Sequence, residues 1–288
     1  MPRSRIKLFL FPVVCGFLLI SCSSVPKRPA EVFVLQTMTE TQLQVANTEA
    51  DRGNYAEALS LLTEAWRLAV STDRPVLRVR VSISRGNVLF YMGRRQEAED
   101  IWKAAQEEAE TAGERALAAA CRIYRQRSAL SVDSSAAGEV LEAVIPELAE
   151  VKSDKLFTAL AWTVIGLAQK ELGFFELAEK SIRNALSIHE GGRYLEQAGY
   201  DWYLIASVRS VAENYQGALE ALDAALGFDR RAENTFALGM DWTARGDVLR
   251  KMGEEDRAVA AWRRAAEIFR SLLLEEQALA AESRIDLR

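Results

Sequence analysis

Glycines recur along this 288-residue chain at a spacing of 40 residues, and this spacing limits what the chain can fold into. Four of the six positions on the spacing are glycine, and a small residue follows each position after five residues. The positions are Gly53, Gly93, Asp133, Gly173, Glu213 and Gly253, and the small residues are Ala58, Ala98, Gly138, Ala178, Ala218 and Ala258. A fixed period of this length is typical of stacked supersecondary units and not of one globular core.

Each unit predicts a pair of amphipathic helices. Segments 81–92 and 96–110 carry apolar residues at helical spacing, and Gly93 permits the turn between them. In the fourth unit, Trp162 and Gly166 place a large and a small residue on one face of the first helix, and Ala178 and Ala185 lie on the second helix. Such a pair of helices would form a hairpin.

These residues resemble the tetratricopeptide repeat (TPR), a family whose units combine a large and a small residue, a glycine–aromatic turn, and alanines on the second helix. The segments 53–58 (GNYAEA) and 214–218 (NYQGA) match the turn closely. The resemblance implies an all-α fold, an α-solenoid of about six TPR-like hairpins over residues 35–288 with a capping helix at the C-terminal end. The period of 40 exceeds the usual 34 of the family and predicts longer helices.

The third unit departs from this pattern, since Asp133 replaces the turn glycine and Pro146 falls inside the expected second helix. Proline removes a backbone hydrogen bond, so we expect that helix to kink or end near Val144. Two interpretations stay open, sequence drift in a tolerant unit and a bend that shapes a binding surface. After the sixth unit, residues 271–288 predict the capping helix, with Leu272, Leu273 and Leu279 turned inward.

The N-terminus carries an export signal. Three basic residues precede the apolar run 8–20, which is too short to span a bilayer. The sequence Leu19-Ile20-Ser21-Cys22 resembles the lipobox of bacterial lipoproteins. This resemblance implies a signal peptide over 1–21, acylation (palmitate among the acyl chains) of Cys22, and a lipidated tether over 22–34. Ser23 then implies the periplasmic face of the outer membrane. The alternative is an ordinary signal peptide with a chance cysteine.

The residues offer little chemistry for an enzyme. His189 is the single histidine, so neither a histidine metal cluster nor a Ser-His dyad can be assembled, and Cys121 lies on an apolar helix face. The glycines serve helix turns and form no phosphate-binding loop. The formal net charge of −5 gives no electrostatic footprint for nucleic acid. We therefore expect no catalytic residues, no metal and no cofactor.

Solenoids of this kind commonly bind partners on their concave side, and the resemblance assigns that groove to particular positions of each first helix. An asparagine can bond an extended backbone, an arginine can fork onto a carboxylate, and a tyrosine offers contact area. These positions predict a groove for proteins or extended peptides; ordinary half-exposed helix residues are the alternative at each one. The predicted groove residues are Asn47, Arg80, Asn87, Phe90, Tyr91, Arg127, Tyr200 and Tyr203.

Together these features predict a non-enzymatic, lipid-anchored TPR adaptor that gathers protein partners in the bacterial cell envelope. One alternative is a dedicated assembly subunit, for outer-membrane barrel assembly, a pilus secretin or the docking of peptidoglycan hydrolases. Another is an accessory protein of a solute transporter, which would need an enclosed pore and not an open groove.

Overall fold

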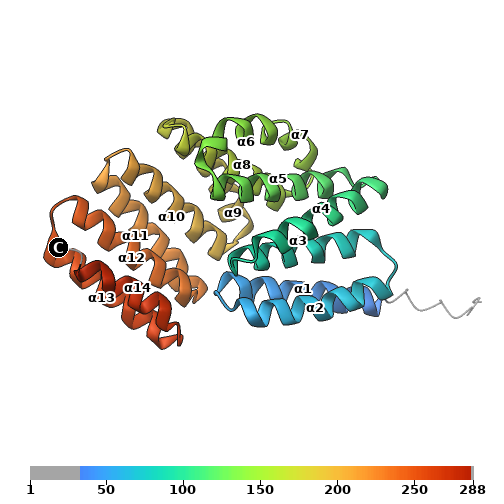
Figure 1. Ribbon diagram of the computed structural model, residues 1–288, viewed down its shortest axis with the longest axis horizontal. Helices are drawn as coiled ribbons and strands as arrows, with labels where there is room; N and C mark the ends of the chain where they lie inside the picture. Colours follow the sequence, from blue (N-terminus) through green and yellow to red (C-terminus); the bar gives the residue numbers. More distant parts are fainter. Residues whose placement is uncertain (1–32, 287–288) are drawn as a thin grey trace, which may run out of the picture. The chain divides into compact units, whose positions relative to one another are not determined.

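The computed structural model describes residues 33–286, and within them every regular element is a helix. Six helical hairpins follow one another, and a last helix covers the sixth (Figure 1). The predicted α-solenoid of six TPR-like hairpins with a C-terminal capping helix is therefore confirmed. The predicted signal peptide, Cys22 and most of the tether lie outside the described residues. No described helix is both long enough and apolar enough to cross a membrane.

The hairpins have nearly uniform dimensions. Their first helices are α1 (Val34–Asp51), α3 (Pro75–Tyr91), α5 (Arg115–Val132), α8 (Lys155–Glu171), α10 (Leu195–Val211) and α12 (Thr235–Lys251). Five second helices are continuous, namely α2 (Tyr55–Ser71), α4 (Arg95–Thr111), α9 (Phe175–Gly192), α11 (Tyr215–Ala232) and α13 (Glu255–Ser271). Two helices of 17 or 18 residues and two short turns account for the 40-residue period.

The turns explain why glycine marks that period. Gly53, Gly93, Gly173 and Gly253 each adopt a left-handed backbone with φ between +76° and +81°. Glycine enters this region without a steric penalty, whereas other residues pay about 1 kcal/mol. Glu213 takes the same turn position with φ +62°. The residue at each of these positions ends the first helix of a hairpin and reverses the chain, so that the second helix runs antiparallel to the first.

Small residues allow the two helices of a hairpin to approach closely. The indole of Trp102 on α4 lies directly against Gly86 of α3, and Trp262 on α13 lies in the same way against Gly246 of α12. Both tryptophans are fully buried. A methyl group at either glycine would lie 2.3 Å from the indole nitrogen, so the glycine is the only residue that leaves room for the ring.

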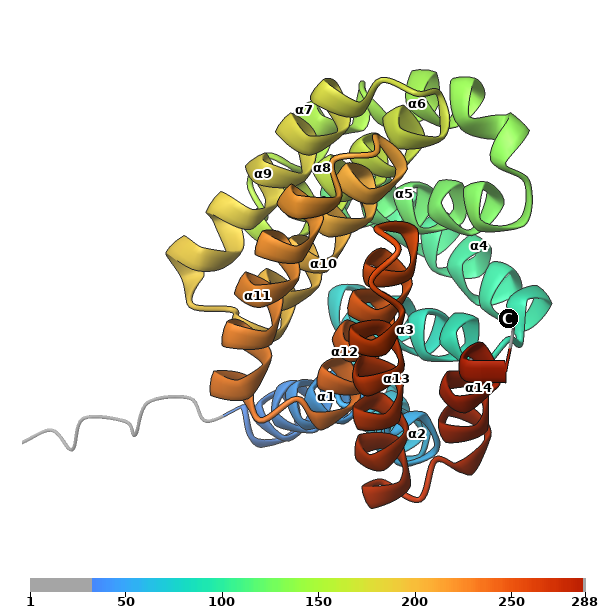
Figure 2. The same ribbon diagram turned by 90° about the vertical axis from the view of Figure 1, so that its left-hand side faces the viewer.

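The first helices form the inner layer of the solenoid. Close contacts join α1 to α3, α3 to α5, α5 to α8 and α10 to α12, and no comparable contact joins consecutive second helices within residues 34–286. Figure 2 shows the second helices α4, α9 and α11 outside this layer. Side chains on the free faces of the first helices therefore face one another across the inside of the solenoid.

The third hairpin is irregular at the predicted place. Its second segment consists of η1 (Ser134–Ala136), α6 (Ala137–Val144) and α7 (Glu147–Val151), and the break falls at Pro146. The helix ends at Val144, as expected from the missing amide of the proline. Asp133 has φ −137°, so this turn does not use the left-handed conformation of the other hairpins.

The prediction for the inward side of the capping helix was wrong for Leu273 and Leu279, whereas Leu272 is half-buried. Leu273 is 91% exposed and Leu279 is 55% exposed, whereas Ala278 and Ala281 are buried together with Ala265 and Phe269. Leu273 occupies the left-handed turn position, with φ +59°. The helix α14 (Glu275–Asp286) therefore begins after it, and the buried face is set by the two alanines.

Candidate functional site

A cationic and aromatic cluster lies on the inner layer where α3 meets α5. We call Asn87, Phe90, Tyr91, Tyr124 and Arg127 the Arg127 cluster. The Nη2 group of Arg127 donates to Oδ1 of Asn87 at 2.5 Å, and Nη1 donates to the Tyr91 hydroxyl at 3.4 Å. The guanidinium carbon is 5.0 Å from the ring centres of Phe90 and Tyr124 and 5.4 Å from that of Tyr91.

A second aromatic pair faces this cluster from the fifth hairpin. The rings of Tyr200 and Tyr203 on α10 are stacked with centroids 6.3 Å apart. Tyr200 is 44% exposed, and yet protein surrounds it closely enough that burial raises the pKa of its hydroxyl, with Tyr91 and Arg127 both acting on it electrostatically. Tyr91 is likewise 43% exposed. Aromatic surface from hairpins two and five is thus presented to the inside of the solenoid.

Contacts between distant hairpins partly close the inside. We call this set of contacts the clasp; it joins the first hairpin turn (Asp51, Gly53 and Tyr55) to Gln197 and Phe236. Gln197 Nε2 donates to Asp51 Oδ2 at 2.8 Å, and the ring of Phe236 packs against Gly53 and, edge-on, against Tyr55. Tyr55 also stacks on Tyr91 with centroids 5.7 Å apart, which connects the clasp to the Arg127 cluster.

Asp51 of the clasp lies in an unusual environment. Its side chain keeps contact with solvent, but α10 and the neighbouring hairpins surround it. Desolvation, followed by repulsion from Glu196, raises the pKa of Asp51 to about 7. The hydrogen bond from Gln197 and the nearby His189 oppose this shift and do not cancel it.

The structure brings together some of the predicted groove residues and separates others. Asn87, Phe90, Tyr91 and Arg127 are in mutual contact, with Tyr200 and Tyr203 facing them. Arg80 instead forms an ion pair with Asp154 at 3.3 Å. Asn47 is exposed on α1 and makes no hydrogen bond to the other predicted residues within the described part of the chain.

Sequence reasoning missed two aromatic residues of this region, Tyr55 and Tyr124. Tyr55 belongs to the segment 53–58 that matches the TPR turn, and it was not among the predicted groove residues. Tyr124 lies three positions before Arg127 on α5, outside the assigned groove positions, and stacks on Trp102 with centroids 5.5 Å apart. Burial raises the pKa of Tyr55 and of Tyr124 to about 12, so both hydroxyls remain protonated near neutral pH.

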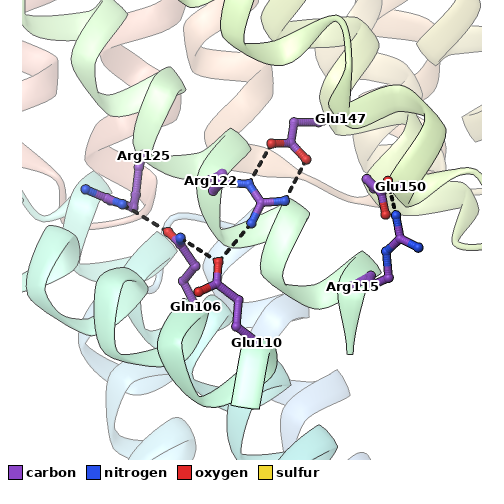
Figure 3. Close-up of polar contacts among 7 residues, drawn as sticks. All are labelled: Gln106, Glu110, Arg115, Arg122, Arg125, Glu147 and Glu150. Carbon is purple, nitrogen blue, oxygen red and sulfur yellow. Dashed lines mark hydrogen bonds and ion pairs between the residues drawn. The ribbon is translucent and has the colours of Figure 1, made fainter. Parts of the chain in front are cut away.

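An open hollow of about 640 Å³ lies beside the irregular third hairpin, between α4, α5 and α6. Arg122 stands there at the repeat position that holds Trp162, Trp202 and Trp242 in later hairpins. Its Nε and Nη2 groups bond both oxygens of Glu147 at 2.6 and 2.9 Å, and Nη1 reaches Glu110 at 3.1 Å (Figure 3).

Two other arginines of α5 are paired in a similar way. Arg125 bonds Gln106 at 3.0 Å, and Arg115 bonds Glu150 at 2.7 Å (Figure 3). Arg125 also bonds Glu99. The break at Pro146 brings the two partner glutamates of α7, Glu147 and Glu150, to this face. Because these ion pairs replace the packing of a tryptophan ring, they account for the hollow without a ligand.

Among residues 33–286, the one cysteine is enclosed by the protein. Cys121 is fully buried, and burial raises the pKa of its thiol to about 12, so the thiol stays protonated and unreactive near neutral pH. Across residues 33–286, no three His, Cys, Asp or Glu side chains gather in a way that could hold a metal ion.

Comparisons with known proteins agree with the fold. No protein-family model and no curated protein matches the chain. A solved Rap protein in complex with Competence and Sporulation Factor is similar, with a TM-score of 0.60 and 16% identity over 87% of this chain and 76% of that one. The apo form of RapI has a TM-score of 0.49 and 14% identity, over 86% of this chain and 96% of that one.

A tetratricopeptide repeat protein from Parabacteroides merdae is also similar, with a TM-score of 0.44 and 15% identity, over 87% of this chain and 93% of that one. At such identities the likeness is one of fold alone. The six hairpins, their glycine turns and the likeness to the Rap protein together assign this chain the fold of a TPR-like α-solenoid.

Proposed function

We propose that this protein is a non-catalytic scaffold that binds an extended segment of a partner protein on the inner layer of its solenoid. The observation that carries the proposal is the Arg127 cluster facing the stacked pair Tyr200 and Tyr203. Hydrogen-bonding, cationic and aromatic groups converge there from three hairpins. Tyr91 is 43% exposed and Tyr200 is 44% exposed. Tyrosine rings are good contact surfaces, so their exposure on the inner layer leaves them available to a partner.

The clasp narrows the kind of partner that fits. Because hairpins one, five and six meet at Asp51, Gln197 and Phe236, a folded domain could reach the inner layer only after the clasp opened. An extended chain segment needs less room. The Rap protein that shares this fold was solved with Competence and Sporulation Factor bound, which supports a binding role for such a solenoid.

The clasp also favours the small-ligand alternative. A solute-binding accessory protein would need an enclosed site, and contacts between the first and sixth hairpins provide part of an enclosure. The two hypotheses predict different results. If the ligand is a protein segment, a polypeptide should copurify with the chain; if it is a small solute, the solute should bind to the chain when no other polypeptide is present.

Removing single groove side chains should weaken partner capture strongly. Tyr200→Ala and Asn87→Ala should each reduce partner recovery from solubilised membranes, because truncation of an interface anchor commonly costs about 2 kcal/mol, roughly thirtyfold in affinity. The measurement is quantitative mass spectrometry of proteins that copurify with the full chain.

Exposed residues of the second helices provide matched controls. Lys180→Ala on α9 and Arg263→Ala on α13 should leave recovery unchanged. Glu179 would be a poor control, because it bonds Arg209 at 2.7 and 3.0 Å and Arg183 at 2.7 and 2.9 Å. Loss of partners from the two controls but not from the groove variants would place binding on the outer helices and contradict the proposal.

We further propose that a lipid on Cys22 holds the scaffold at a membrane of the bacterial envelope, on the periplasmic face of the outer membrane. The support is the lipobox-like Leu19-Ile20-Ser21-Cys22 behind a basic and apolar start. Stable anchoring needs more than one acyl chain, and bacterial lipoproteins of this type carry several.

Cys22→Ala should abolish lipidation. Cells given labelled palmitate should incorporate it into the wild-type chain and not into the variant, and the wild-type chain should enter the detergent phase on phase separation. The matched control is Cys121→Ala, which should retain the label because that cysteine is buried in the solenoid. Label on the Cys22→Ala protein, or none on the wild type, would show that the anchor is not there.

A further inference from the structure

Arg127 has no acidic partner, unlike several other partly buried arginines of the inner and neighbouring helices. Arg125, two residues earlier on α5, bonds Glu99, and Arg209 bonds Glu179 at 2.7 Å. Arg127 bonds only the neutral groups of Asn87 and Tyr91, and its Nε lies buried without any partner.

The surroundings of Arg127 compensate its charge incompletely. Three ring faces within about 5 Å of the guanidinium attract the cation, each by roughly 1 kcal/mol. Two acids have an electrostatic effect in this region, and each has another partner: Asp51 acts on Tyr124 but bonds Gln197, and Asp201 acts on Tyr200 but contacts His189. A cation that is withdrawn from water and unpaired is costly, and a carboxylate that bonded it would remove that cost.

The donors around Arg127 fit an incoming carboxylate. A guanidinium carries five N–H groups, and Asn87, Tyr91 and the buried Nε account for three of them, which leaves one N–H on each Nη nitrogen. Tyr200 adds a hydroxyl whose pKa is raised by burial, so it stays protonated and can donate. Two N–H groups and one hydroxyl can together satisfy both oxygens of one carboxylate.

We propose that Arg127 binds a carboxylate of the partner segment, with Tyr200 as a second donor to it. The inference rests on the proposed function, which it extends by naming the chemistry of the ligand. The carboxylate is either the C-terminal group of the segment or the side chain of an aspartate or glutamate within it.

In the experiment, the full chain is solubilised in detergent and incubated with a randomised pool of heptapeptides, which is prepared in four forms. The pools have a free or an amidated C-terminus, each with or without Asp and Glu, and retained peptides are counted by mass spectrometry. The wild-type protein should retain carboxylate-bearing peptides at least tenfold better than the amidated pool without Asp and Glu. The two intermediate pools tell a terminal carboxylate from a side-chain one.

Variants then assign the preference to Arg127. Arg127→Gln keeps a hydrogen-bond donor but not the charge, and it should lose the tenfold preference; Tyr200→Phe should reduce it. The matched control is Arg85→Gln, since Arg85 is half-buried over the ring of Trp66, 5.5 Å away, with no acidic partner, but packs against α2 and not in the Arg127 cluster. It should keep the preference.

The outcomes separate the two proposals. Retention of all four pools to the same extent by the wild-type protein would overturn the carboxylate inference and leave the scaffold proposal standing, as would a preference that persists in a folded Arg127→Gln protein. Retention of no pool would overturn the proposed binding of extended segments itself. The comparison of pools by the wild-type protein does not depend on how any variant folds.

Discussion

Asp241→Asn is expected to stabilise the protein at alkaline pH by about 3 kcal/mol or more and to reduce the loss of stability that the protein shows as the pH rises above 5. Asp241 on α12 and Asp229 on α11 are each only 1% exposed, and their carboxyl groups interact directly. Burial raises the pKa of both, and the charge of Asp229 raises that of Asp241 further. Two adjacent carboxylates cannot both ionise without large repulsion, so the folded protein retains a proton there.

The sign of the effect follows from proton linkage. In the unfolded chain both groups titrate near the ordinary value of 3.8, whereas in the folded protein they titrate at higher pH. The contribution of the pair is therefore fully present below that ordinary value and is lost as the pH rises through the raised pKa values. Each unit of raised pKa corresponds to about 1.4 kcal/mol, which makes a change of several kcal/mol reasonable. Asparagine supplies a permanent donor to Asp229 and needs no proton.

Urea unfolding of the full chain at pH 5, 7 and 9 measures this. The wild-type free energy of unfolding should fall across the series, and that of Asp241→Asn should fall clearly less, with the remaining fall coming from the buried Asp51 and Asp229. Asp223→Asn is the matched control, since Asp223 lies on α11 with a side chain 63% exposed and only a surface ion pair to Arg245. It should follow the wild-type curve, and an equal fall in all three proteins would contradict the shared proton.

Hairpins four and five contain a polar contact at the same repeat positions as the Asp229–Asp241 pair. His189 and Asp201 occupy the same repeat positions as Asp229 and Asp241, one period earlier, and Nδ1 of His189 lies 2.6 Å from Oδ2 of Asp201. The three preceding pairs of positions, 69/81, 109/121 and 149/161, hold only Ala, Val or Cys. Polar pairing is thus a property of hairpins four to six, with a nitrogen–oxygen contact in one pair and a carboxyl–carboxyl contact in the next.

Much of the fold was predictable from the sequence because it depends on local rules. A left-handed turn favours glycine, as at Gly53, Gly93, Gly173 and Gly253, and the break at Pro146 follows from a missing amide. The inward face of the capping helix was not predictable in the same way. Its register depends on Leu273 adopting the left-handed conformation without being glycine, and the sequence carries no signal for that.

The site was predictable in part, for a different reason. Repeat positions placed Asn87, Tyr91 and Arg127 on one inner face, because neighbouring hairpins are related by nearly the same rotation. The contacts of the clasp depend on how that rotation accumulates over five hairpins. No local sequence pattern predicts the accumulated rotation. Arg80 shows the opposite error, since it occupies a groove position yet pairs with Asp154, at the start of α8, instead of joining the cluster.

Gly53→Ala is expected to destabilise the protein by about 2 kcal/mol more than Gly93→Ala, although the two glycines occupy the same turn position. Both have a left-handed backbone, with φ +81° and +76°, so both substitutions pay the same conformational strain of about 1 kcal/mol. A methyl group at Gly93 would meet nothing within 4 Å. At Gly53 it would lie 2.8 Å from the ring of Phe236, and overpacking of this kind typically costs about 1–3 kcal/mol.

The ring of Phe236 has little freedom to move aside, because it packs edge-on against Tyr55 and against Phe269, with centroids 6.3 and 5.9 Å apart. The added methyl group should therefore open the clasp. A double-mutant cycle isolates this contact: in a Phe236→Ala background, Gly53→Ala should cost no more than Gly93→Ala. Urea unfolding gives the four free energies. Equal costs of the two glycine substitutions in the wild-type background would show that the first and sixth hairpins do not meet in solution, and the inner layer would then be an open groove.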